Sequence, residues 1–328
     1  MQIANMMVLG LFLIAVGAPM AAFGQPAPGH HRIAFINVGP AAANTKNVAA
    51  FRAGLADLGY IEGRNLTIDY RWGDQKVDQL PALVNELLAA KPAVIVSTGG
   101  QAPIRAIKST ANIVPVVFIT GDPVAEGFVR SLARPGGNMT GLAVLGSDLE
   151  AKRLELLTEI VPKARKIALV WNPDQPLIAA VVRNVEVAGS RLRLTLLPWQ
   201  ARNAAELETV FAEITKSRVD ALFILADPVL GFERARIVDF VSKQRLPGIY
   251  FWREFADIGG LASYATNLPA VYRRTATYVD KILKGTPPGQ LPVEQPTTFE
   301  LVINLKTAKS IGISVPSALQ QRADTLLE

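Results

Sequence analysis

The sequence predicts an α/β protein of two lobes, each a parallel sheet covered on both faces by helices, joined by a hinge that the chain crosses several times. Two observations predict this class. Apolar runs alternate with amphipathic helical segments, and the whole series occurs twice. The phrases VVFITGDPV (116–124) and ALFILADPV (221–229) also end corresponding strands of the two series, with a weaker copy, IALVWNPDQ, at 167–175. A length of 328 residues suffices for two cores.

The first series opens the chain after its N-terminal segment. Its strands read as continuous or half-buried apolar runs, expected at 32–39, 65–72, 93–98 and 116–120. Helices are expected at 44–58 and 77–90, because their apolar residues recur at helical spacing, and a short helix follows Gly99-Gly100. A turn-rich stretch, ARPGGNMTGL (133–142), then breaks the alternation.

The second series starts with a helix whose first residues resemble a capping box. Ser147 would be the N-cap and Glu150, three residues on, its reciprocal partner. Strands are then expected at 167–171, 193–199, 221–226 and 246–251, and helices near 176–189, 203–216 and 231–244. The same architecture is therefore predicted twice.

The remaining residues are too few for a third domain. They predict a short strand at 260–265, a helix at 268–283, an extended stretch at 292–305 and a final helix near 316–327. We expect them to return to the two lobes, with crossings near 140–146, 262–267 and 290–297. The predicted lobes are 30–142 plus 265–290, and 143–264 plus 291–328.

The first 24 residues indicate a cleaved secretory signal. They carry no charged side chain, contain an apolar stretch from Met6 to about Val16, and end on the small-x-small sequence Ala22-Phe23-Gly24. An uncleaved anchor is the alternative, but the apolar run is short for a hydrocarbon core of roughly 30 Å. The chain has no cysteine and hence no lipid-anchoring thiol, so we expect retention in a periplasm.

Several kinds of chemistry are excluded by composition. Without cysteine there is no thiol nucleophile or thiolate metal site, and the two histidines, His30 and His31, lie in what we expect to be a frayed tail. No phosphate-binding or dinucleotide fingerprint is present, so we expect no catalytic, metal or cofactor site. The net charge of +6 is diffuse, and no N-terminal helix-turn-helix is present, so no nucleic-acid partner is expected.

The candidate site lies where parallel strands end, because open α/β sheets bind ligands beyond their carboxyl ends. The candidates in the first lobe are Asn37, Thr98, Thr120 and Asp122. Those in the second lobe are Asn172, Asp227, Tyr250 and Trp252, with Tyr264 near the hinge.

Two questions stay open at these positions. Each Asp-Pro pair either caps a helix, with proline at its first position, or directs its carboxylate to a ligand amine. The aromatic rings either pack into the edge of a lobe or cover the apolar part of a solute.

Five segments together resemble a known family: 51–72, 121–142, 151–173, 246–264 and 291–316. They are similar to ABC-transporter substrate-binding proteins, including the tryptophan- and tyrosine-binding TrpX-type proteins, which have the type I periplasmic-binding fold. The resemblance implies that two lobes close on a small solute, such as an amino acid or an aromatic or carboxylated compound, and deliver it to a membrane permease. A periplasmic ligand sensor for a chemoreceptor or signalling kinase is the alternative, since the same fold serves both.

Overall fold

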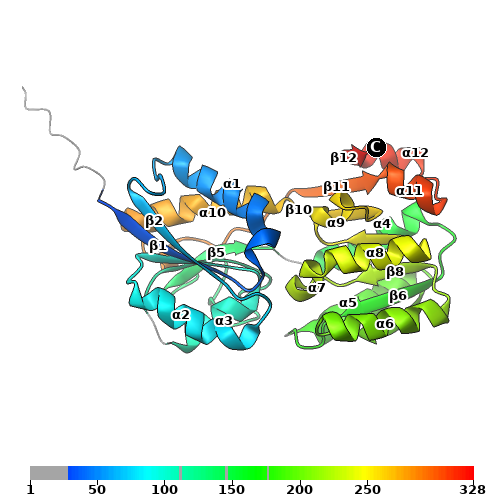
Figure 1. Ribbon diagram of the computed structural model, residues 1–328, viewed down its shortest axis with the longest axis horizontal. Coiled ribbons are helices and arrows are strands. Elements are labelled where there is room, and N and C mark those ends of the chain that lie inside the picture. Colours follow the sequence, from blue (N-terminus) through cyan, green and yellow to red (C-terminus); the bar gives the residue numbers. More distant parts are fainter. Residues whose placement is uncertain (1–28, 111–112, 145–146, 176) are drawn as a thin grey trace, which may run out of the picture.

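The computed structural model describes residues 29–110, 113–144, 147–175 and 177–328, with the side chains of Ser147 and Asp148 also outside the description. The predicted secretory signal at 1–24 therefore lies outside the described residues. No helix within these ranges is long and apolar enough to cross a membrane. The described chain forms two α/β lobes side by side, which confirms the predicted fold class (Figure 1).

The first lobe is built on a five-stranded parallel sheet of order β2-β1-β3-β4-β5. Its strands are β1 (His31–Asn37), β2 (Leu66–Trp72), β3 (Val94–Thr98), β4 (Val116–Thr120) and β5 (Met139–Ala143). Its helices are α1 (Thr45–Asp57), α2 (Leu80–Ala89), α3 (Gln101–Ser109) and α10 (Leu268–Leu283), with short 3-10 turns η1 (Ala41–Asn44), η2 (Val77–Gln79) and η3 (Pro288–Gln290).

Strand alternation divides the core of the first lobe into two layers. Ile33 and Phe35 of β1 pack against α1 and α10, while Ala34 and Ile36 face α2 and α3. Both layers are apolar, which explains why the inner strands β1, β3 and β4 are continuous apolar runs rather than alternating ones.

The second lobe is built on a seven-stranded sheet of order β12-β11-β10-β9-β8-β6-β7. All neighbouring strands are parallel except the antiparallel pair β10–β11. The strands are β6 (Lys166–Trp171), β7 (Thr195–Gln200), β8 (Ala221–Ile224), β9 (Gly248–Tyr250), β10 (Ala262–Thr266), β11 (Phe299–Asn304) and β12 (Thr325–Leu327).

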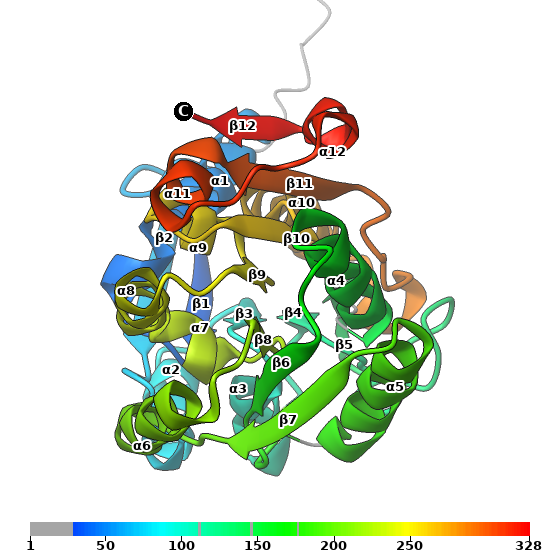
Figure 2. The ribbon, with the colours of Figure 1, turned by 90° about the vertical axis from the view of Figure 1, so that its right-hand side faces the viewer.

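Helices cover both faces of this sheet as well. Figure 2 shows α4 and α5 on one side and α6 and α8 on the other. The helices of the lobe are α4 (Ser147–Ile160), α5 (Ile178–Arg191), α6 (Ala204–Ser217), α7 (Pro228–Phe232), α8 (Arg234–Gln244), α9 (Arg253–Asp257), α11 (Leu305–Ile311) and α12 (Ser317–Arg322).

Three elements differ from the expectations. The turn-rich stretch 133–142 contains the start of β5, whose residues are buried and pair with β4. Gly141 permits this pairing, because a Cβ there would lie 2.0 Å from the carbonyl oxygen of Phe118. The expected helix at 316–327 is split into α12 and β12, and His31 belongs to β1 rather than to a frayed tail, with its ring 5.5 Å from that of Tyr60.

The chain passes between the lobes after β5, after β10 and again before β11. Two short residue ranges belong to the opposite lobe from the one we expected. Residues 265 and 266 end β10 in the second sheet, whereas Leu291 and Val293 pack in the core of the first lobe. Extended segments have no periodicity that assigns them to a lobe, so only these contacts place them.

Candidate ligand-binding site

A cleft of about 510 Å³ lies between the lobes, at the carboxyl ends of strands from both sheets. Its volume falls in the range of small-molecule sites. Five of the nine candidate residues line it: Asn37, Thr120, Asp122, Asp227 and Trp252. The other four, Thr98, Asn172, Tyr250 and Tyr264, do not.

In the wall formed by the first lobe, the side chain of Asn37 links neighbouring residues through hydrogen bonds. Its amide nitrogen donates to Thr98 Oγ1 at 2.8 Å, and its oxygen accepts the N–H of Gly39 at 2.7 Å. Thr98 is therefore fully buried behind Asn37 instead of facing the cleft. Tyr272, on α10, also lines the cleft with its hydroxyl 3.4 Å from the same amide, and burial raises its pKa to about 12, so it remains a neutral phenol.

The first Asp-Pro pair caps a turn, not the expected helix. Asp122 Oδ1 accepts the N–H groups of Val124 at 3.1 Å and Ala125 at 3.0 Å, and the residues that follow form turns up to β5. Asp122 is exposed where it lines the cleft. Thr120, just before it, is buried, and its hydroxyl has no hydrogen-bond partner among the described residues.

The second Asp-Pro pair does cap a helix. Asp227 is the N-cap of α7 and accepts the N–H of Leu230 at 2.7 Å, with proline at the first helical position. The amides of Asn172, at 3.2 Å, and Gln175 also donate to its carboxylate. Asn172 consequently lies behind Asp227 rather than in the cleft, and burial raises the pKa of the Asp227 carboxyl.

The aromatic candidates do not all face the cleft. Tyr250 is fully buried in the core, its ring stacked on Phe255 with centroids 4.4 Å apart, whereas Phe251 and Trp252 line the cleft. Tyr264 packs against Phe299, with centroids 5.9 Å apart, and does not line the cleft either. The prediction of Tyr250 and Tyr264 as cleft residues is therefore wrong in this arrangement.

Sequence reasoning missed a charged pair in the wall of the cleft. Glu150 and Arg153, one turn apart on α4, form an ion pair and both line the cleft, although each is only 1% exposed. The expected capping box does not use Glu150, because its Oε1 accepts the N–H of Ala226 at 2.8 Å. The sequence did contain a signal: Glu150 and Arg153 lie three residues apart on the face of α4 that is otherwise apolar, where charged residues are unexpected.

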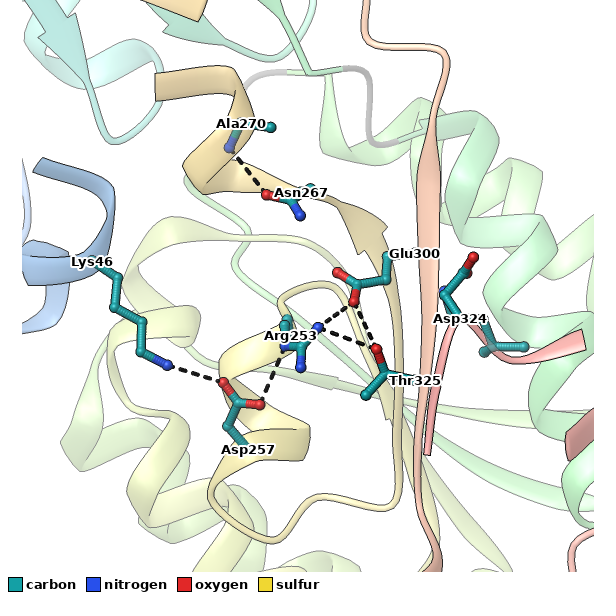
Figure 3. A network of polar contacts seen from close by, with 9 residues as sticks. Lys46, Arg253, Asp257, Asn267, Ala270, Glu300, Asp324 and Thr325 are labelled. Carbon is teal, nitrogen blue, oxygen red and sulfur yellow. Dashed lines mark hydrogen bonds and ion pairs between the residues drawn. The ribbon is translucent and has the colours of Figure 1, made fainter. Parts of the chain in front are cut away.

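The two lobes also touch each other across the cleft. The ring of Phe232, on α7, packs against the core of the first lobe and lies so close to Gly39 that a Cβ there would be 2.0 Å from Cζ. Lys46, on α1, donates to Asp257 on α9 at 3.3 Å (Figure 3). The lobes are therefore in direct contact in this structure.

The ion pair made by Lys46 is the end of a longer polar network in the second lobe. Asp257 also pairs with Arg253 at 3.3 Å, and Arg253 pairs with Glu300 of β11 (Figure 3). Thr325, on β12, donates to the same Glu300 carboxylate at 3.1 Å. The network thus links α1 of the first lobe to the last two strands of the second sheet.

Fold and cleft together define a two-lobed α/β binding protein with its ligand site between the lobes. Residues 33–327 match the family described as ABC transporter substrate binding protein, and the chain belongs to that family. Among curated proteins it is similar to the tyrosine-binding protein of Clostridioides difficile, with 22% identity over 269 residues, covering 82% of this chain and 77% of the relative.

Two solved structures have closely similar folds. A conserved domain protein from Vibrio cholerae superposes with a TM-score of 0.84 at 25% identity, covering 90% of this chain and 99% of that one. The ABC domain from Streptococcus pneumonia in complex with L-Trp superposes with a TM-score of 0.83 at 20% identity, covering 91% and 100%. The family that the five sequence segments resemble is thereby confirmed.

Proposed function

We propose that this protein is the periplasmic solute-binding component of an ABC importer and that it captures an aromatic amino acid, or a closely related solute, for delivery to a membrane permease. The observation that carries the proposal is the cleft itself. It is lined by both lobes, so a bound solute contacts both lobes and stabilises their closed arrangement.

The lining supports a solute with a polar and an aromatic part. Phe251, Trp252 and Tyr272 present rings to the cleft, where they would cover an aromatic side chain. Gly100 is the N-cap of α3 and provides no side-chain cap, so the backbone N–H groups of Gln101 and Ala102 would be available to a carboxylate. Two similar proteins, the tyrosine-binding protein of Clostridioides difficile and the Streptococcus pneumonia domain in complex with L-Trp, point to the same class of solute.

The test is to identify the solute and then remove one of its contacts. Protein purified from the periplasm is denatured, and the released small molecules are identified by mass spectrometry; isothermal titration then measures L-tyrosine, L-tryptophan and a sugar as comparison. Trp252→Ala should weaken binding of the aromatic amino acid by roughly 1–3 kcal/mol, because a ring contact is lost. Binding of the sugar, and of neither amino acid, would refute the proposed solute class.

A further inference from the structure

The wall of the cleft contains a carboxylate held in one orientation. Glu150 Oε1 is used twice, by the N–H of Ala226 at 2.8 Å and by the ion pair with Arg153. Arg153 is itself held in place: it donates to the carbonyl of Tyr264 at 3.4 Å, and its guanidinium lies 5.9 Å from the ring centroid of Phe251. These contacts orient both side chains between α4, the end of β8 and β10, while Arg153 Nε and Nη2 have no hydrogen-bond partner among the described residues.

The second oxygen of this carboxylate is unused. Glu150 Oε2 is buried and has no hydrogen-bond partner within the described part of the chain. A buried carboxylate oxygen without a donor costs free energy, and a donor on a bound solute would remove that cost. Asp227 offers no such position, because Leu230, Asn172 and Gln175 already donate to it.

The charge of the cleft favours a cation. Among the described residues that line it, five are acidic and two are basic: Asp122, Glu126, Glu150, Asp227 and Glu254 against Arg153 and Arg234. This acidic excess contrasts with the chain as a whole, whose net charge is +6. The formal charge of the lining is therefore negative, the sign that favours a positively charged group.

We propose that Glu150 is a specificity-determining residue that selects solutes carrying a positively charged nitrogen, with Oε2 accepting a hydrogen bond from the solute ammonium. Arg153 is a positioning residue, because its ion pair occupies Oε1 and leaves Oε2 for the ligand. The inference deepens the proposed function, since it names the group of the solute that this cleft recognises, and it replaces Asp122 and Asp227 as the expected partners of an amine.

The experiment compares ligands that differ only in the amine. Isothermal titration measures L-tryptophan and L-tyrosine against their deaminated analogues, 3-indolepropionate and 3-(4-hydroxyphenyl)propionate, on wild type and on Glu150→Gln. Glu150→Gln should weaken binding of the amino acids by about 10- to 100-fold, the effect of losing a hydrogen bond between charged groups, and leave the analogues at their wild-type affinities. Equal losses for both kinds of ligand, or no loss, would overturn the proposal.

Two further variants separate recognition from folding. Glu155→Gln is the matched control, because it changes a carboxylate on the same helix that pairs with Lys152 at 3.0 Å on the exposed surface, and it should change neither affinity. If Glu150→Gln fails to fold because Arg153 is left unpaired, the double variant Glu150→Gln/Arg153→Met removes both buried charges. It should show the same loss for amino acids relative to their analogues.

The solute released by wild-type protein distinguishes this inference from the proposed function. An aromatic amino acid supports both. A different solute with a basic nitrogen refutes the aromatic class but supports Glu150, provided that Glu150→Gln weakens its binding. A released solute without a basic nitrogen overturns the role of Glu150. If no solute is released, a thermal-shift panel of amino acids and polyamines decides, and failure of every solute with an ammonium N–H to stabilise wild type overturns it as well.

Discussion

Replacing Gly39 with alanine should hold the two lobes apart. Gly39 is not among the glycines with a positive φ, so its backbone accepts a side chain. A Cβ would nevertheless lie 2.0, 2.4 and 2.5 Å from three ring atoms of Phe232, which belongs to the other lobe. Because ordinary contact begins near 3.4 Å, the ring must withdraw by about 1.4 Å from the first lobe.

The size of the effect follows from the burial of that ring. Phe232 is partly buried, and full burial of a phenylalanine side chain is worth about 1.5–3 kcal/mol. Loss of roughly half of this, about 0.75–1.5 kcal/mol, shifts the equilibrium between closed and open lobes by roughly 4- to 13-fold toward open.

Because the chain has no cysteine, spin labels attach only at cysteines introduced for the purpose. Val77→Cys and Val187→Cys place one spin label on each lobe, at residues that are 50% and 52% exposed, and electron–electron resonance measures the distance between them in ligand-free protein. Gly39→Ala should move the distribution toward longer distances. The control is Gly121→Ala, since nothing lies within 4 Å of its Cβ, and it should leave the distances unchanged.

A second variant tests the cause. If the clash with Phe232 opens the lobes, Gly39→Ala/Phe232→Ala should match Phe232→Ala alone, because the ring that meets the new methyl group is absent. A wild-type distance distribution in Gly39→Ala would refute the reasoning. It would show that the contact between Gly39 and Phe232 does not hold the lobes together in solution.

Three further predictions concern stability and closure. Tyr250→Phe should keep or raise the free energy of unfolding by up to about 1 kcal/mol, because the buried hydroxyl has no partner among the described residues; a clear loss in urea denaturation would contradict this. The N–H groups of Lys166 and Arg165 lower the pKa of Asp220, so its carboxylate stabilises the fold above the unfolded pKa of about 3.8, and this contribution is lost as pH falls through the lower folded pKa. The difference in unfolding free energy between wild type and Asp220→Asn should therefore shrink on acidification below about pH 4, and a constant difference would be evidence against this linkage. Lys46→Ala should shift the free energy between closed and open lobes by no more than about 1 kcal/mol toward open, because the ion pair with Asp257 is exposed. The distance between the spin labels should also become less sensitive to salt, and an unchanged salt response would show that the pair is not formed.

The sequence by itself determined the elements and their class. Continuous apolar runs predicted β1, β3, β4, β6 and β8, and helical spacing predicted α10 with the bounds the structure has. These signals are local, because burial on one stripe of a helix or on both faces of a strand is recorded in consecutive residues. The Asp-Pro-Val phrase belongs to this group as well, since an N-cap such as Asp227 is a contact between near neighbours.

Tertiary structure alone decided which strand-end residues face the cleft. Tyr250 and Trp252 stand two residues apart, yet Tyr250 stacks on Phe255 in the core while Trp252 lines the cleft, because the strand ends between them. Asn172 and Thr98 lie behind Asp227 and Asn37, an order set by contacts more than 50 residues apart in the chain. Glu150 shows the same limit. Its spacing from Ser147 was that of a local cap, but the N–H of Ala226, 76 residues away, binds it instead, and so brings a buried carboxylate into the wall of the cleft.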